Sequence, residues 1–144
     1  MPQTVETALA EATLYNDKQD YALVKLPPAA ITAAAGVVAE IGEPFCALLA
    51  DKDEVSLLIP AQALADFANR LPGHTAEASA YRLITLDVVL EPDLTGFFAR
   101  VSQALADAGV SILALSAFSR DHLFVPKAQF DAAFAALQSL KNNR

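Results

Sequence analysis

The chain has 144 residues, of which 54% are hydrophobic, and a formal net charge of −7 at pH 7. Its ten lysines and arginines are scattered, whereas nucleic-acid binding needs clustered basic side chains that neutralise phosphates. The sequence also lacks a basic amphipathic stretch that could hold an anionic membrane surface. The composition therefore disfavours nucleic-acid and membrane partners and predicts a compact protein with a sizeable core.

The lack of a recognisable targeting signal and the single cysteine favour a cytoplasmic location. No uncharged stretch reaches the ~18–20 residues of a membrane-spanning helix, and the longest, 26–39, contains two prolines and a glycine. The first lysine is Lys18, so the N-terminus lacks the basic patch and apolar segment of a secretion signal. Cys46 is the only cysteine, which excludes an internal disulfide and fits a reducing compartment.

The first half of the chain predicts a strand, a helix, a hairpin and a second helix. In chain order these are a strand at Tyr21–Leu26, a helix at Pro28–Ile41, hairpin strands at Phe45–Ala50 and Leu57–Pro60 around a charged turn at Asp51–Glu54, and a helix at Ala61–Leu71. Before them, Ala12–Asn16 is expected to form a strand, although Ala8–Leu14 could equally begin as a short helix. Pro72 and Gly73, followed by 74–79, form the only plausible linker.

The second half repeats the first. A shift of 66 positions places Leu57-Leu58-Ile59-Pro60 on Leu123-Phe124-Val125-Pro126, and the apolar positions of the following helix also agree. The expected elements are a strand at Tyr81–Leu90, a helix over Leu94–Asp107, hairpin strands at Ser111–Ser116 and Leu123–Pro126 around a turn at Ala117–Arg120, and a helix at Ala128–Leu140. The unit β-α-β-β-α therefore occurs twice.

This duplication predicts an α+β protein with two ferredoxin-like βαββαβ units side by side, each with an antiparallel sheet and its helices on one face. Each half lacks one strand. Tyr81–Leu90 is long enough to finish the first sheet and start the second, and Ala12–Asn16 could supply the last strand of the second. The predicted division is an N-terminal segment at 1–20, a first unit at 21–77 and a second unit at 78–144.

The stretch from Asp93 to Ile112 carries the most information about function. Its apolar residues recur at helical spacing, at Leu94, Phe97, Phe98, Val101, Leu105 and Ala108. Asp93 is placed to cap the helix, and Gly109 lies where a left-handed residue would end it.

This stretch resembles the opening of an ACT domain, the small regulatory module attached to many enzymes of amino-acid metabolism. The specific pieces are the turn Asp93-Leu94-Thr95-Gly96 and the hairpin Ser111–Val125 with its charged turn. The whole chain is similar to short stand-alone tandem-ACT proteins, which also resemble the arginine sensor CASTOR. The resemblance implies an ACT-type fold and an amino acid bound at an inter-domain or inter-subunit interface.

The chemistry of the turn suits such a ligand. A helix N-terminus presents unpaired N–H groups and a partial positive charge to a carboxylate, and a glycine allows close approach to the backbone. We expect Asp93 to hold the ligand's ammonium group; the alternative is that Asp93 only caps the helix and Gly96 only packs. The residues that the resemblance assigns to ligand binding are Asp93, Leu94, Thr95, Gly96, Phe97, Val110, Ser111, Ile112 and, as the contact for a cationic end, Asp121. In the first half, Leu26-Pro27-Pro28-Ala29 replaces the turn and removes two backbone donors, so one site per chain is expected.

Candidates for catalysis are few. His74 lies in the predicted linker, and Asp121 and His122 are neighbours on a strand, where side chains alternate between faces. The two histidines and Cys46 show no metal-ligand spacing, and no cofactor-binding motif is present, so we expect no enzyme activity, no metal and no cofactor.

Three functions remain open. The first is a regulatory protein that binds an amino acid or similar small metabolite and acts allosterically. The second is a ligand-free module that dimerises or docks on a partner enzyme or regulator. The third is a small enzyme that uses Asp121 and His122, which strand alternation disfavours. A homodimer is expected under the first two, because ACT-type sheets commonly join edge to edge.

Overall fold

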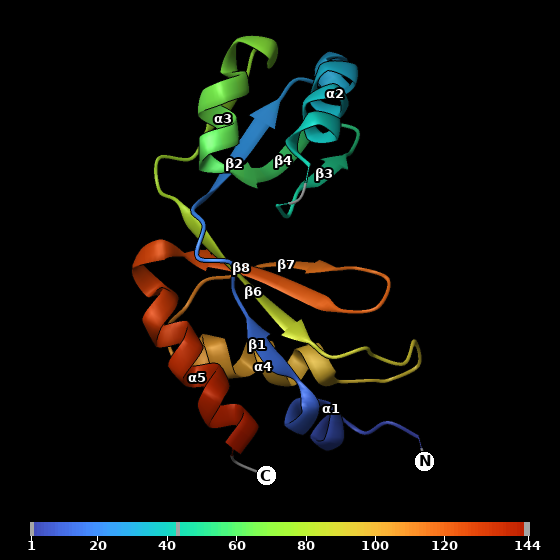
Figure 1. Ribbon diagram of the computed structural model, residues 1–144. Helices are drawn as coiled ribbons and strands as arrows, with labels where there is room; N and C mark the ends of the chain where they lie inside the picture. The colour runs from blue at the N-terminus through green and yellow to red at the C-terminus, as the bar shows by residue number, and fades with distance from the viewer. Residues whose placement is uncertain (1, 43, 143–144) are drawn as a thin grey trace. The chain divides into compact units, whose positions relative to one another are not determined.

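The computed structural model describes residues 2–42 and 44–142 (Figure 1). Contacts divide the chain into two compact units, one covering 1–18 and 82–144 and the other 19–81. We call them the discontinuous unit and the continuous unit. Among the described residues, no helix has the length and apolar character needed to cross a membrane.

The continuous unit is a small antiparallel sheet with two helices on one face. Its main elements are β2 (Tyr21–Leu26), α2 (Ile31–Ile41), β3 (Ala47–Ala50), β4 (Val55–Pro60), α3 (Ala61–Phe67) and β5 (Thr75–Ala76). β4 pairs with both β2 and β3, and β5 also pairs with β2. Alternate residues of β2 and β4, such as Val24 and Leu57, share one buried cluster with Ala34 and Val37 of α2 and Leu64 of α3.

The discontinuous unit has the same plan with an additional N-terminal helix. Its elements are α1 (Val5–Glu11), β1 (Thr13–Tyr15), β6 (Tyr81–Asp87), α4 (Phe97–Asp107), β7 (Leu113–Ser116), β8 (Asp121–Pro126) and α5 (Phe130–Asn142). The strand order is β1-β6-β8-β7, and β1 pairs antiparallel with β6, with Leu14 opposite Leu86. The N-terminal segment therefore contains both the helix and the strand that its sequence allowed.

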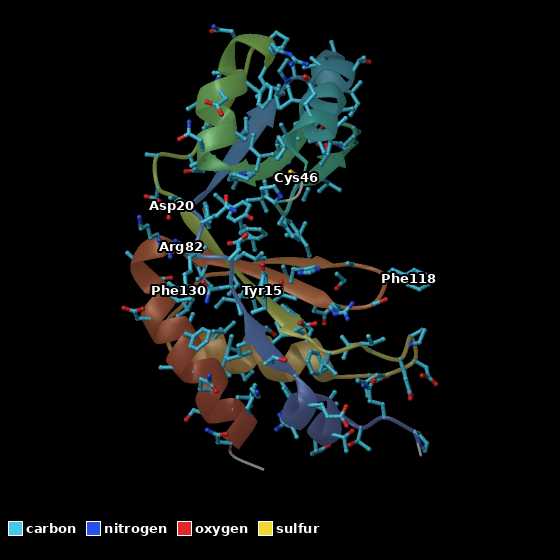
Figure 2. The ribbon with its side chains drawn as sticks, viewed as in Figure 1. Tyr15, Asp20, Cys46, Arg82, Phe118 and Phe130 are labelled. Atoms are coloured by element: carbon cyan, nitrogen blue, oxygen red, sulfur yellow. The ribbon has the colours of Figure 1, made fainter. Side chains whose placement is uncertain are left out.

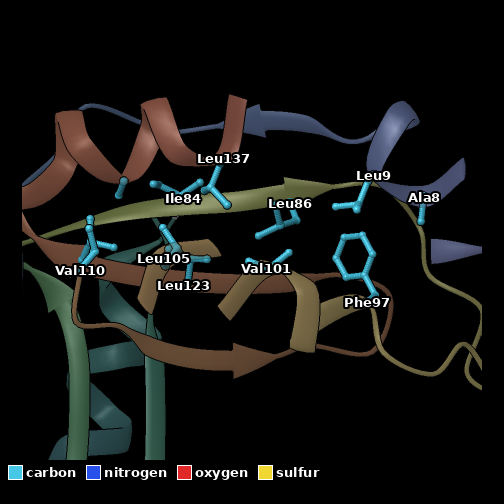
Figure 3. Packing of buried hydrophobic residues seen from close by; sticks show 12 residues of the cluster. Ala8, Leu9, Ile84, Leu86, Phe97, Val101, Leu105, Val110, Leu123 and Leu137 are labelled. Carbon is cyan, nitrogen blue, oxygen red and sulfur yellow. The ribbon is translucent and has the colours of Figure 1, made fainter. Parts of the chain in front are cut away.

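The core of the discontinuous unit lies between its sheet and three helices (Figure 3). Ile84 and Leu86 of β6 meet Val101 and Leu105 of α4, and all four are at most 1% exposed. Further members of this cluster come from α1, β8 and α5, namely Ala8, Leu9, Leu123, Val125, Ala133 and Leu137. Burial of these side chains fixes the direction of α4, whose first residues border the site described below.

The predicted fold class is confirmed, because each unit is ferredoxin-like with an antiparallel sheet and packed helices. The repeat register also holds: a shift of 66 positions carries α2 onto α4, β3 onto β7 and β4 onto β8. The connection after the first strand differs in length, since it spans 27–30 in the continuous unit and 88–96 in the discontinuous one. The domain limits 1–20, 21–77 and 78–144 remain a prediction.

Three sequence-based boundaries were wrong. The strand expected at Tyr81–Leu90 ends at Asp87, and the helix expected from Leu94 begins at Phe97. The expected linker at 74–79 contains β5, which pairs with β2, and only Tyr81 of β6 adds a further pair, to Tyr21. In the first two cases the local apolar pattern continued past the actual boundary, whereas β5 has no apolar pattern and is a strand because it pairs with β2.

Gly109 ends α4 in the left-handed conformation that its position predicted, with a φ of 75°. Its N–H donates to the Ala106 carbonyl, and the Val110 N–H donates to the Leu105 carbonyl, both at 3.0 Å. These are the two bonds of a Schellman motif, and Val110 packs in the same cluster as Leu105.

We expect Gly109→Ala to lower the free energy of unfolding by about 1 kcal/mol, because an L residue is strained at this φ. Gly36→Ala in α2 is the matched control. Its new methyl group would lie 3.9 Å from Arg70 Nη2, an ordinary contact, and helix propensity predicts a gain of up to ~1 kcal/mol. Urea unfolding of both variants measures the difference, and equal effects would contradict the assignment.

Candidate functional site

Helix α4 is not capped by Asp93, although the sequence had suggested this role. The N-cap residue is Gly96, which has a φ of 93°, and no side chain caps the helix. Asp93 lies three residues earlier and is exposed. The capping role predicted for Asp93 is therefore wrong, and the physical reason is that a left-handed glycine turns the chain directly into the helix. The first intrahelical bond runs from the Arg100 N–H to the Gly96 carbonyl at 3.2 Å, so the N–H groups before it have no acceptor within the helix.

A pocket of about 360 Å³ lies beside this helix start. We call it the α4 pocket. Its walls are the loop after β6, the first turn of α4, and the turn of the β7–β8 hairpin, with lining residues Leu90, Glu91, Pro92, Leu94, Gly96, Phe97, Phe98, Ala99 and 116–121. The Leu90 N–H donates to the Ser119 carbonyl at 2.8 Å, which joins the loop to the hairpin. The volume is at the lower end of the range for small-molecule sites.

Asp121 is the buried charged residue of this pocket, only 8% exposed. Its Oδ1 accepts a hydrogen bond from the Ser116 hydroxyl at 2.8 Å, across the first pair of the β7–β8 hairpin. The neighbouring Arg120 is turned to Asp87, and its Nε donates to Oδ1 of that carboxylate at 2.7 Å. The pocket therefore combines a buried carboxylate with the N–H groups of a helix start.

The remaining lining mixes apolar side chains with polar ones such as Glu91 and Ser119, and one apolar member, Phe118, is fully exposed. Phe118 stands at the tip of the β7–β8 hairpin and points away from the ribbon (Figure 2). Its relative exposure is 101%, while Leu94 and Phe98 on the other walls are half-buried. An aromatic side chain at the rim can fold over an occupant of the pocket and bury apolar area.

The sequence-assigned ligand residues fall into two groups within one chain. Leu94, Gly96, Phe97 and Asp121 line the α4 pocket, and Asp93 and Thr95 belong to the same loop without lining it. Val110, Ser111 and Ile112 follow the other end of α4, an 11-residue helix about 16 Å long. There the Ser111 N–H donates to Gln129 Oε1 at 3.1 Å. One chain therefore does not bring the two groups together.

The titratable candidates outside the pocket have structural partners. His122 Nδ1 lies 2.8 Å from Thr85 Oγ1 on β6, whereas Asp121 bonds Ser116 on β7. Burial lowers the pKa of His122, and the nearby Asp121 carboxylate only partly opposes this shift. His74 Nδ1 lies 2.8 Å from the Leu71 carbonyl.

The half-buried Cys46 is a small packing residue, and burial raises the pKa of its thiol. Across the described residues, no three His, Cys, Asp or Glu side chains cluster in a way that could hold a metal ion.

Comparison with known families bears on the segment that contains this pocket. Residues 78–139 match the ACT domain family. The match covers β6, α4, β7, β8 and most of α5, and therefore every residue of the α4 pocket. A comparison with curated proteins returned no match.

Solved structures share the fold of almost the whole chain. A Vibrio cholerae protein of unknown function is 23% identical, with a TM-score of 0.74, over 96% of this chain and 97% of that one. The ligand-free regulatory subunit of aspartate kinase from Thermus thermophilus is 19% identical, with a TM-score of 0.62, over 90% and 97%. The chain covers only 34% of aspartate kinase from Clostridium acetobutylicum, with 14% identity and a TM-score of 0.69 over 91% of this chain. These similarities show the fold alone, and the similarity to CASTOR remains a prediction.

Sequence reasoning missed two walls of the α4 pocket. The first is Leu90–Pro92, which was assigned in part to a strand, and the second is the hairpin turn at Ser116–Arg120. A signal for the first wall was present, because the connection between strand and helix is longer in the second half than in the first. The second wall is joined to the loop by the bond between Leu90 and Ser119, which no local pattern indicates.

Proposed function

We propose that the protein is a non-catalytic regulatory protein that binds a free amino acid in the α4 pocket. The observation that carries the proposal is that one small cavity holds both the buried Asp121 carboxylate and the start of α4, whose first N–H groups have no acceptor within the helix. A zwitterion has the complementary charges, because its carboxylate suits a helix N-terminus and its ammonium suits a carboxylate. The match to the ACT domain family supports a regulatory, small-molecule-binding role.

The lining supports a preference among amino acids. Arg120 is already paired with Asp87, and the other walls include Leu90, Leu94 and Phe98. A side-chain carboxylate would meet the carboxylates of Asp121 and Glu91, which also belong to the lining, and would lose hydration without gaining a cationic partner, which is costly. We therefore propose amino acids without a side-chain carboxylate as ligands; a cationic side chain, which the resemblance implied for Asp121, would have Glu91 as a second carboxylate partner.

Regulation would follow from a difference in affinity between two states. A ligand shifts an equilibrium only by as much as it binds one state better than the other. β7 is the edge strand of the discontinuous unit, and an unpaired strand edge favours pairing with a second copy. We propose a cytoplasmic homodimer in which Val110–Ile112 of a second copy complete the ligand site, as the ACT resemblance implied.

The second candidate function is a ligand-free docking module for a partner enzyme or regulator. The observation in its favour is the exposure of two apolar side chains, Phe118 at 101% and Val89 at 57%, on the two segments that the bond between Leu90 and Ser119 joins. Exposed apolar residues close together are typical of interaction surfaces. The two candidates differ in one respect: only the first requires a small molecule in the pocket.

A thermal-shift screen of the full chain against the twenty amino acids tests the proposal. A ligand at ~100 times its dissociation constant stabilises the folded state by about 2.7 kcal/mol, which raises the melting temperature by several degrees. We expect a selective rise with amino acids that lack a side-chain carboxylate and one binding site per chain by titration calorimetry. Sedimentation velocity then reports whether the ligand changes the dimer. A flat response to all twenty would contradict amino-acid binding and favour the docking module.

A further inference from the structure

Gln3, which precedes the N-cap residue of helix α1, contacts the loop that forms one wall of the α4 pocket. The side-chain amide of Gln3 bonds the loop backbone twice: its Nε2 donates to the Val89 carbonyl at 2.9 Å, and its Oε1 accepts from the Glu91 N–H at 2.8 Å. The Gln3 N–H also donates to Glu91 Oε2 at 3.2 Å. A single amide thus satisfies a donor and an acceptor of the loop, as a neighbouring strand would.

Gln3 is itself held in place by the start of α1. Thr4 caps this helix in a reciprocal capping box with Thr7, in which each side chain bonds the backbone N–H of the other. Farther along α1, Ala8 and Leu9 pack in the same cluster as Phe97 of α4. In Figure 1 the N-terminal segment and the loop between β6 and α4 extend to the same side of the discontinuous unit. The position of the Gln3 amide is therefore set by an ordered helix and not by a free tail.

The residue between the two anchored positions is a wall of the pocket. Leu90 lies between Val89 and Glu91, lines the α4 pocket, and is bonded on its other side to the hairpin through Ser119. The loop 88–96 has no regular secondary structure, so ordering it on ligand binding would cost conformational entropy. Anchoring it in advance removes part of that cost and raises affinity.

We propose that Gln3 is a positioning residue for the α4 pocket, which holds Leu90 and Glu91 in the geometry that a ligand needs. The inference deepens the proposed function and rests on it for the ligand. The anchoring of the loop by Gln3 can be measured without any ligand. A failure of the Gln3 inference can therefore be told apart from a failure of the proposed amino-acid binding.

The test compares Gln3→Met with Gln103→Met in the full chain. Methionine keeps the length of the side chain and removes both hydrogen bonds of the amide. Gln103 is an exposed residue on α4 whose Nε2 donates to Asp107 Oδ1 at 2.8 Å, one turn away on the same helix, so its replacement loses a bond that does not touch the pocket. The two variants therefore differ in which segment loses its contact.

Amide hydrogen exchange without ligand is the first readout. We expect Gln3→Met to speed exchange in 88–94 roughly tenfold, the effect of losing about two ordinary hydrogen bonds, with no change in β8. Gln103→Met should leave the loop unchanged. The positioning role would be overturned by equal amide exchange rates of the loop in both variants. Faster exchange throughout the discontinuous unit in Gln3→Met would also overturn it.

Calorimetry with each of the twenty amino acids is the second readout. For any amino acid that wild-type protein binds, Gln3→Met should raise the dissociation constant roughly tenfold and Gln103→Met less than twofold. An unchanged dissociation constant with a loosened loop would overturn the link to affinity. If wild-type protein binds none of the twenty, the proposed function fails, and the exchange measurement alone decides the role of Gln3.

Discussion

Phe97→Ala is expected to lower the free energy of unfolding by about 3–5 kcal/mol, the usual loss when a buried aromatic ring is truncated. Phe97 is only 3% exposed and shares the core cluster with Leu9, Leu86 and Val101 (Figure 3). It is also the first residue of α4, so the same ring that fills the core fixes where the pocket-lining turn begins. Urea unfolding followed by far-ultraviolet circular dichroism measures the change.

Phe98→Ala is the matched control for this prediction. Phe98 is the next residue of the helix and lines the same pocket, but its side chain is half-buried and packs only at the margin of the cluster. Because less apolar area is lost, we expect a cost of about 1–2 kcal/mol. Losses of equal size in the two variants would show that Phe97 does not anchor the helix start.

The elements that could be predicted from the sequence are those whose burial follows a local period. Tyr21–Leu26 forms a strand with the predicted limits because its residues alternate between faces, and α4 ends at Gly109 because only glycine is free of strain there. The repeat added a second constraint. The prolines at Pro60 and Pro126 stop equivalent strands, so the amino-acid pattern alone places the hairpins and helices around them in register.

The elements that could not be predicted depend on contacts between distant residues. Val88–Leu90 has the apolar character of a strand, yet it is a loop, because its backbone groups bond Gln3 and Ser119. Gln3 and Val89 are 86 positions apart in the sequence. The strand β5 is equally hidden, since two polar-flanked residues become a strand only through their pairing with β2.

In the candidate site, too, some residues could be predicted from the local sequence pattern and others could not. Gly96 and Phe97 were predictable as the glycine turn and first apolar residue of an amphipathic helix, and both line the pocket. Asp93 was assigned a role from its position before that helix, but the left-handed Gly96 takes over the cap. Asp121 was named from a resemblance, whereas its burial beside Ser116 gives a physical reason to expect a ligand contact.

The second prediction with a large effect concerns these two aspartates. Asp121→Asn should weaken amino-acid binding by about 10–100-fold, because a charge-assisted hydrogen bond to an ammonium group contributes about 1.5–3 kcal/mol. Asparagine retains an Oδ1 that can accept from the Ser116 hydroxyl, so the hairpin should keep its structure. Calorimetric titration with the amino acid that gives the largest thermal shift provides the measurement.

Asp93→Asn removes the same charge from the same unit and serves as the control. Because Asp93 is exposed and does not line the α4 pocket, we expect its dissociation constant to stay within about twofold of wild type. The reverse result, with Asp93 essential and Asp121 dispensable, would place the ammonium group on the outer side of the loop. The ligand would then bind where a second copy of the chain could reach it, and the α4 pocket would lose its role as the ligand site.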